Sequence, residues 1–148
     1  MLNSDYKDIL SALSNRKVKF LLVGAYAMAV HGYPRSTMDI DLWVMPDPEN
    51  AFMVLKALED FGAPTSDLSP KDLQKEGIVF QIGVAPRRID ILTSVDGLNF
   101  EDSFTHSQKV EIEGISIQVL SIPDLIKNKR STGRIKDLAD AEALEMEY

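Results

Sequence analysis

The chain has 148 residues, of which 45% are hydrophobic and 26% are charged, and this balance excludes an intrinsically disordered or low-complexity protein. A formal net charge of -7 disfavours non-specific binding to DNA, and the absence of cysteine excludes disulfides and thiolate chemistry. The longest apolar stretch, residues 20–30, is short of the roughly 20 residues of a membrane span, so no membrane association is expected. The first residues lack the order of a signal peptide, so we expect a single cytoplasmic domain over residues 1–148.

The first half of the chain alternates between helix-forming and strand-forming segments. Asn3 or Ser4 is expected to cap a helix that ends near Asn15. The apolar run VKFLLVG, residues 18–24, is typical of a central strand that stops at a glycine. Residues 25–30 favour a short helix, which the segment HGYP then ends. A strand over DIDLWV, a turn at residues 46–48 and a helix over residues 50–61 are expected next.

Two hairpins and a helical C-terminus are expected in the second half. After a polar loop with a short helix from Pro70 to Lys75, the segments GIVFQIGV and RRIDILTS predict one hairpin, and residues 109–113 and 115–120 predict another. Ser121 is expected to precede a helix over residues 124–132, with Pro123 near its first turn, and after a break at Gly133 a second helix is expected over residues 134–145. We therefore predict an α/β (α+β) domain with a mixed, largely antiparallel sheet of about five strands and helices packed on it, including C-terminal helices at about residues 122–146.

Two acids occupy alternate positions in the strand-like segment DIDLWV. Successive side chains of a strand point to opposite faces, so Asp39 and Asp41 share one face while Ile40 and its apolar partners form the other. Two neighbouring carboxylates repel each other, and the pKa of each would rise unless a cation lies between them. Mg²⁺ suits this pair because it prefers carboxylate oxygens, water and substrate phosphates, and no His or Cys lies nearby.

The segment RRIDIL repeats this pattern with a third acid, Asp90. If the first hairpin places its strand beside DIDLWV, Asp90 joins Asp39 and Asp41 on one face. Three acids could hold two Mg²⁺ ions about 4 Å apart, which is the arrangement that positions an attacking hydroxyl and a leaving pyrophosphate. Mn²⁺ could replace Mg²⁺ there. The structural alternative is that some of these acids are turn or cap residues.

Three segments in this order, VGAYAMAVHGYPRSTMDIDLWV, RRIDIL and IPDLIKNKRSTGRIKDLADAEAL, resemble the nucleotidyltransferase superfamily, whose fold is similar to the catalytic core of DNA polymerase β. The resemblance covers most of the chain and is narrowest to the small single-domain branch that includes abortive-infection toxins and minimal nucleotidyltransferases. In that family a strand ends in Gly-Gly or Gly-Ser, a helix follows, the next strand carries Asp-apolar-Asp or Glu, and a later strand carries a third acid. The resemblance implies this fold and this order of site residues.

By position, the resemblance assigns Asp39, Asp41 and Asp90 as the catalytic, metal-binding acids and Gly24 as the first glycine of the nucleotide site. It also places Ala25 at the second position, where the family has Gly or Ser. Ala keeps the backbone N–H but lacks the serine hydroxyl. Further nucleotide-binding residues implied by the resemblance are Arg35 and Thr37, which match the Arg-x-Thr that precedes the acids in this branch.

A basic segment near the C-terminus carries five cations between residues 127 and 136 without an acid among them. Lys127, with Arg134 or Lys136, could neutralise triphosphate oxygens. The alternative is a solvated helix face, on which Asp137 or Asp140 would pair locally with neighbouring cations three or four residues away.

The resemblance implies a Mg²⁺-dependent nucleotidyltransferase that moves a nucleoside monophosphate from a nucleoside triphosphate to a hydroxyl on RNA, a protein or a small molecule. Asp90 would be the general base or a metal ligand. Ala25 motivates an alternative, a non-catalytic nucleotide-binding or partner-binding module of the same fold, such as one half of a toxin–antitoxin pair with a cognate protein partner. Metal-dependent phosphoester hydrolysis is a third hypothesis, because it also uses clustered acids.

Overall fold

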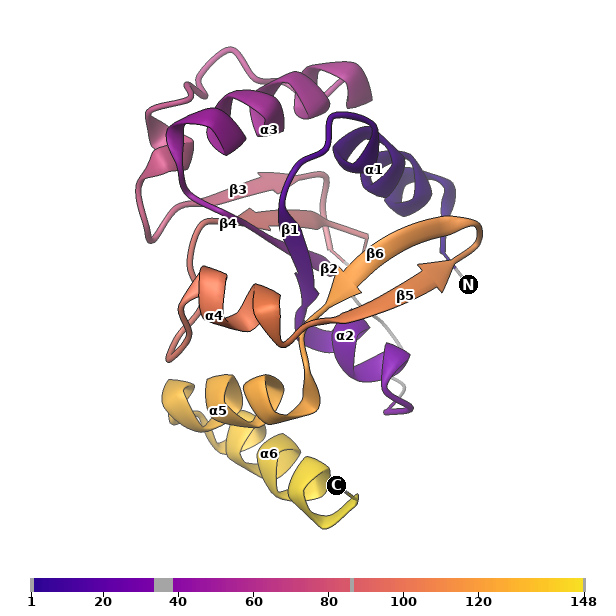
Figure 1. Ribbon diagram of the computed structural model, residues 1–148, viewed down its shortest axis with the longest axis vertical. Coiled ribbons are helices and arrows are strands. Elements are labelled where there is room, and N and C mark those ends of the chain that lie inside the picture. The colour runs from indigo at the N-terminus through magenta and orange to yellow at the C-terminus, as the bar shows by residue number, and fades with distance from the viewer. Residues whose placement is uncertain (1, 34–38, 86, 148) are drawn as a thin grey trace.

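The computed structural model describes residues 2–33, 39–85 and 87–147, and these residues form a single mixed sheet of six strands (Figure 1). The strand order is β3-β4-β2-β1-β6-β5. The pairs β1–β6 and β2–β4 are parallel, and the other three neighbouring pairs are antiparallel. The strands are β1 (Phe20–Val23), β2 (Ile40–Val44), β3 (Val79–Ile82), β4 (Ile89–Leu92), β5 (Gln108–Ile112) and β6 (Ile115–Val119).

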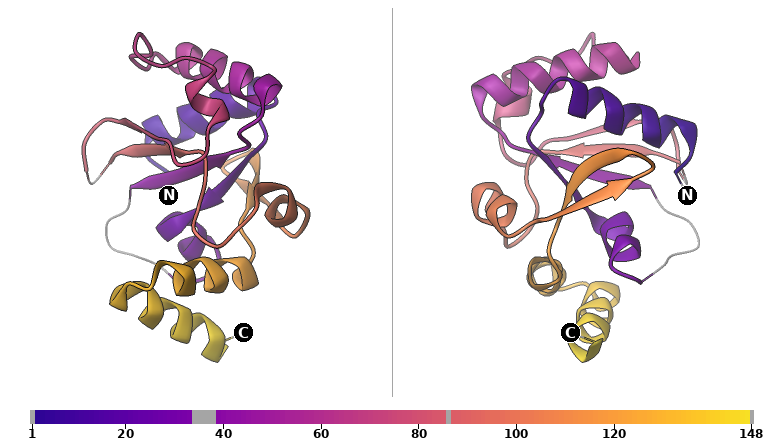
Figure 2. Two further views of the ribbon diagram at one scale, coloured as in Figure 1. Left: turned by 90° about the vertical axis from the view of Figure 1, so that its left-hand side faces the viewer. Right: turned by 45° about the vertical axis from the view of Figure 1, so that its right-hand side comes forward.

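Helices cover both faces of the sheet, as Figures 1 and 2 show. They are α1 (Ser4–Asn15), α2 (Gly24–Val30), α3 (Pro48–Phe61), α4 (Phe100–Thr105), α5 (Ile122–Thr132) and α6 (Ile135–Glu147). α1 and α3 lie together on one side, whereas α4 and the α5–α6 pair lie on the other. None of the described helices has the length and apolar character needed to cross a membrane.

The alternation of β2 divides its side chains between these two layers. Ile40, Leu42 and Val44 are fully buried, as expected for the apolar face. On the opposite face Trp43 is also buried, and its ring makes an edge-to-face contact with Phe100 of α4 at 5.1 Å between centroids. Trp43 therefore packs under α4 and does not line the cleft described below.

Local signals in the sequence explain where the principal helices begin and end. The side chains of Asn3, Asp47 and Ser121 each accept a hydrogen bond from a backbone N–H in the first turn of the helix that follows. Gly62 and Gly133 end α3 and α5 in the left-handed conformation that glycine adopts without strain. These caps confirm the predicted positions of α1, α3 and α5.

The structure differs from the prediction in three places. The sheet has six strands in the described residues instead of about five, and the helix expected from Pro70 to Lys75 is only a 3-10 turn over Asp72–Gln74. The helix α4 was not predicted at all. It has six residues, capped by Asn99, and is held by burial of Phe100 and Ser103. A segment of that length is too short for helical periodicity to be recognised in the sequence.

Candidate active site

Four neighbouring strands each place one residue in a straight row across the sheet. The pairing register aligns Val23 of β1 with Asp41 of β2, Asp41 with Asp90 of β4, and Asp90 with Gln81 of β3. Paired residues of adjacent strands point to the same face and lie about 4.8 Å apart along the row. The prediction that Asp90 joins Asp41 on one face is therefore confirmed, and the parallel pairing of β2 with β4 is what brings them together.

Gly24, at the end of β1, lets the backbone approach the carboxyl group of Asp41 closely. Its φ angle is +67°, in the left-handed region that favours glycine. A Cβ atom at this position would collide with Asp41 Oδ2 and would lie 3.2 Å from Asp41 Cγ. Glycine is thus favoured here for two independent reasons. Ala25, the next residue, has no positive φ, so alanine is not strained there.

The carboxyl group of Asp41 is held in an environment that opposes its ionisation. Burial raises its pKa to about 7, and the charge of Asp90, a side-chain hydrogen bond with Asp90 and the charge of Asp39 act in the same direction. The positive charge of Arg88 opposes this shift without overcoming it. An additional cation beside Asp41 would therefore be stabilised.

Arg88 supplies a cation to the other two acids. Its guanidinium group donates to both oxygens of Asp90, with N···O distances of 2.7 and 3.1 Å, and lies 3.2 Å from Asp39 Oδ2. Its backbone N–H donates to Asp39 Oδ1 at 3.0 Å. Asp39 is thus directed at Arg88, at the entrance to β4, whereas Asp41 faces the cleft beside Gly24.

The arrangement fits one Mg²⁺ ion better than two. Within the described residues, no three carboxylate or imidazole side chains converge so that all could bind one metal ion, and Asp39 contacts Arg88. Asp41 and Asp90 remain as neighbouring carboxylates, and each oxygen of Asp90 keeps a second lone pair. Mg²⁺ commonly takes one or two protein carboxylates and completes its shell with water and substrate phosphates. The binding of two Mg²⁺ ions by all three acids remains a prediction.

A cleft of about 530 Å³ lies over the row of acids, within the usual size range of small-molecule sites. Its floor includes Gly24, Ala25, Asp41 and Asp90. Its facing wall comes from α5, the beginning of α6 and the short connection between them. The residues of that wall are Asn128, Lys129, Thr132, Arg134 and Asp137.

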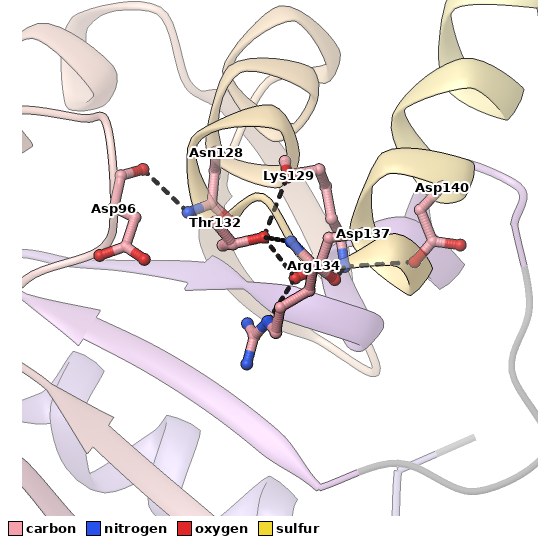
Figure 3. A network of polar contacts seen from close by, with 7 residues as sticks. All are labelled: Asp96, Asn128, Lys129, Thr132, Arg134, Asp137 and Asp140. Atoms are coloured by element: carbon pink, nitrogen blue, oxygen red, sulfur yellow. Dashed lines mark hydrogen bonds and ion pairs between the residues drawn. The ribbon is translucent and has the colours of Figure 1, made fainter.

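Asp137 is the centre of a polar network that joins α5 to α6 (Figure 3). It accepts from Thr132 Oγ1 at 2.7 Å and from Arg134 Nε at 2.8 Å, and Lys129 Nζ lies 3.3 Å from it. Burial favours a higher pKa for Asp137, but these hydrogen bonds and the Lys129 charge outweigh it and lower the pKa. Lys129 also pairs with Asp140 at 3.3 Å.

Arg134 is the cation of this network that remains most open to solvent. Its side chain is 75% exposed, compared with 14% for Lys129. Figure 3 shows its guanidinium group extending away from both helices, and the residue lines the cleft. The pairing of Arg134 with Asp137 at three-residue spacing confirms the local ion pair expected from the sequence.

Two contacts hold α5 against the chain that follows β4. Asn128 Nδ2 donates to the carbonyl of Asp96 at 2.9 Å. Gly97 lies so close to Ser131 that a Cβ atom at position 97 would collide with the serine side chain. The wall of the cleft is therefore anchored to the segment that continues from the strand carrying Asp90.

The structure does not bring every predicted residue to the cleft. Lys127 lines a separate hollow between α4 and α5, and Lys136 is exposed outside the residues that line the cleft. Arg35 and Thr37 lie outside the described residues. Helical periodicity could have identified Lys129 instead, because it follows the buried Leu125 by four residues and shares its face, whereas Lys127 lies on the opposite one.

Solved structures show a similar fold. A crystal structure from Thermotoga maritima, described as that of a "putative nucleotidyltransferase", aligns with a TM-score of 0.61 and 18% sequence identity, covering 99% of this chain and 94% of the other. At this identity the likeness concerns the fold alone. Among curated protein sequences, none matches this chain significantly. The family model described as "Nucleotidyltransferase of unknown function (DUF6036)" matches residues 2–147, and the chain therefore belongs to this nucleotidyltransferase family.

Proposed function

We propose that the protein is a Mg²⁺-dependent nucleotidyltransferase that moves a nucleoside monophosphate from a nucleoside triphosphate to a hydroxyl acceptor. The observation that carries the proposal is the register pairing of Asp41 with Asp90 on the floor of a cleft whose facing wall presents Arg134. Membership of a nucleotidyltransferase family supports the same reaction class.

The residues present suit the charges of a triphosphate. Asp41 and Asp90 would hold Mg²⁺, which neutralises phosphate charge when it is bound. Arg134 faces them across the cleft and can donate charge-assisted hydrogen bonds to phosphate oxygens. Gly24 lets the backbone at the start of α2 lie directly beside the Asp41 carboxyl group, because it carries no side chain.

The transfer forms one bond and breaks one. The acceptor hydroxyl oxygen bonds to the α-phosphorus, the bond from that phosphorus to the oxygen bridging to the β-phosphate breaks, and pyrophosphate leaves. Asp90 is the proposed acceptor of the hydroxyl proton, because it lies on the side of the acid pair that faces the sheet edge.

Calorimetric titration with nucleoside triphosphates tests the binding step. Wild-type protein should bind a triphosphate in the presence of Mg²⁺ and lose this binding when EDTA is added. Asp41→Ala and the conservative Asp41→Asn should both abolish the metal-dependent component, whereas Asp60→Asn, at an exposed acid paired with Arg16 elsewhere, should leave it intact. Absence of metal-dependent nucleotide binding in the wild type would reject the proposal.

A second candidate function is a non-catalytic nucleotide-binding or partner-binding member of the same fold, for example in a toxin–antitoxin pair. The observation that favours it is that Arg88 already neutralises Asp39 and Asp90 from within the chain. Incubation of the protein with cell lysate and nucleotides radiolabelled at the α-phosphate separates the two candidates. Nucleotide binding without any label attached to a macromolecule or small acceptor would support the non-catalytic function.

A further inference from the structure

The cleft is closed on one side of the acid pair and open on the other. On the closed side, α2 begins directly after β1, packs against β1 and β2, and places Gly24 against Asp41. On the other side, the row of paired residues continues from Asp90 to Gln81 and then reaches the edge of the sheet. Val79 and Gln81 of this edge strand line the same cleft as the acids. An acceptor therefore has access to Asp90 across β3.

The main-chain groups of β3 alternate between its partner strand and the free edge. Thr93 N donates to the carbonyl of Ile78 at 3.0 Å, which identifies Ile78–Thr93 as a hydrogen-bonded position of the β3–β4 ladder. Such positions alternate in an antiparallel pair, so the backbone N–H and C=O groups of Val79 and Gln81 point away from β4. These are the two residues whose side chains line the cleft.

The edge strand β3 is short, but it lacks the charged side chains that usually protect a sheet edge. The sequence from Val79 to Val84, VFQIGV, contains no charged residue, and the side chains of Val79 and Val84 are 53% and 80% exposed. The opposite edge strand, β5, carries Lys109 and Glu111, both exposed, as is usual for a protected edge. An uncharged edge with outward-facing main-chain groups suits the addition of an extended peptide and offers no cation to a nucleic-acid backbone.

We infer that the acceptor of the proposed transfer is a polypeptide that adds to β3 as an extra strand and directs a Ser, Thr or Tyr hydroxyl into the cleft beside Gln81. This inference rests on the proposed function. The row of aligned residues would continue from Gln81 to the acceptor residue. The Cα atom of that residue would lie two strand spacings, about 10 Å, from the Cα atom of Asp90. The nucleotide's α-phosphate occupies the gap between them.

The reaction is that of the proposed function with a defined acceptor. The side-chain oxygen bonds to the α-phosphorus, the bond to the β-phosphate bridging oxygen breaks, and pyrophosphate leaves. The hydroxyl proton passes to Asp90 through a bridging water molecule, because the α-phosphate lies between the acceptor residue and Asp90. The product is a polypeptide that carries a nucleoside monophosphate in a phosphodiester linkage.

A peptide-labelling assay tests the inference. The probe is a mixture of short peptides with Val and Ile at alternate positions, Lys at both ends and a central Ser, Thr or Tyr, and the matched control mixture has Ala or Phe at the centre. Each mixture is incubated with wild-type protein, Mg²⁺ and nucleoside triphosphates radiolabelled at the α-phosphate, and total RNA is tested in parallel. Only the hydroxyl-containing peptides should become labelled.

Variants at the edge distinguish strand addition from other modes of binding. Val79→Pro removes an outward N–H at the first residue of an edge strand, where proline is tolerated. We expect it, and Val79→Lys, to raise the KM for the peptide roughly tenfold, a change of about 1.4 kcal/mol, with a much smaller change in the KM for the nucleotide. Phe52→Lys, at a residue of α3 with similar exposure, is the control and should leave both constants unchanged.

The outcomes are distinguishable. Metal-dependent nucleotide binding together with label on RNA, or with no label on the peptides, overturns the polypeptide acceptor and leaves the proposed function standing. Equal labelling by wild type and both Val79 variants overturns strand addition. Failure to bind nucleotide at all rejects the proposed function and this inference with it.

Discussion

Gly24 and Asp41 lie so close together that a Cβ atom at position 24 would overlap the Asp41 carboxyl group unless that group moved. The contact arises because Val23, the last residue of β1, is paired with Asp41 in the antiparallel β1–β2 ladder, and the chain then turns into α2 with a positive φ at Gly24. The glycine therefore links the geometry of the strand end to the carboxyl group that is central to the proposed metal site.

Gly24→Ala should destabilise the protein by roughly 2–5 kcal/mol, the sum of left-handed strain and overpacking against Asp41. Gly62→Ala is the matched control, because Gly62 has a φ of +92° but no atom within 4 Å of the added Cβ, so only the strain remains. Thermal or urea unfolding of both variants provides the measurement. Equal destabilisation would show that the contact with Asp41 has no energetic consequence.

Asp41 makes stability depend on pH in a definite direction. Its pKa is about 7 in the folded protein and near 3.8 when unperturbed, so between these values the folded state binds more protons than the unfolded state. The contribution of this group to stability is therefore lost as the pH rises through about 7. Asp41→Asn should stabilise the metal-free protein at pH 8 by roughly 1–4 kcal/mol and should have little effect near pH 4, since one pKa unit corresponds to about 1.4 kcal/mol.

Urea unfolding of wild type and Asp41→Asn across this pH range provides the test, with EDTA present. Addition of Mg²⁺ at pH 8 should stabilise the wild type and not the variant, because binding to the folded state shifts the equilibrium. A difference between the two proteins that does not change with pH would contradict the assigned environment of Asp41.

Arg88→Met should lower the melting temperature of the metal-free protein and increase the further rise that Mg²⁺ produces. Removal of the guanidinium group leaves Asp39 and Asp90 without their cation, so a divalent ion gains more by joining them, and Asp39 becomes available as a ligand. Arg16→Met, which breaks the ion pair with Asp60 on the surface, is the control. Differential scanning fluorimetry with graded Mg²⁺ measures both effects. A smaller Mg²⁺ response in Arg88→Met than in the wild type would assign Arg88 a supporting role in metal binding.

Arg134→Met should weaken triphosphate binding roughly tenfold, since a hydrogen bond to a charged group contributes about 1.5–3 kcal/mol before solvent screening. Binding of the nucleoside monophosphate should change much less. Lys136→Met removes a neighbouring cation that does not line the cleft, and it should leave both affinities unchanged. Calorimetry with the two nucleotides and the two variants provides the measurement. Weaker triphosphate binding by Arg134→Met alone indicates a direct phosphate contact, whereas equal weakening in both variants indicates a general electrostatic effect.

Much of the local structure could be predicted from the sequence because local interactions determine it. The caps at Asn3, Asp47 and Ser121 and the glycine at position 133 specify helix ends through contacts within a few residues. The alternation in DIDLWV specifies which side chains of β2 face the core. The short helix α4 was missed because tertiary burial of Phe100, and no periodic pattern, holds it in place.

Local sequence patterns were sufficient to place Asp41 on the polar face of a strand beside a glycine turn, since strand alternation and backbone freedom are properties of the local chain. Which acids meet depends instead on long-range strand pairing. The parallel register of β2 with β4 pairs Asp41 with Asp90. Asp39 instead accepts a hydrogen bond from the backbone of Arg88, just before β4. On α5, Lys129 lines the cleft, whereas Lys127 lines a separate hollow. Those outcomes depend on strand order and helix packing between residues far apart in sequence, which no local pattern encodes.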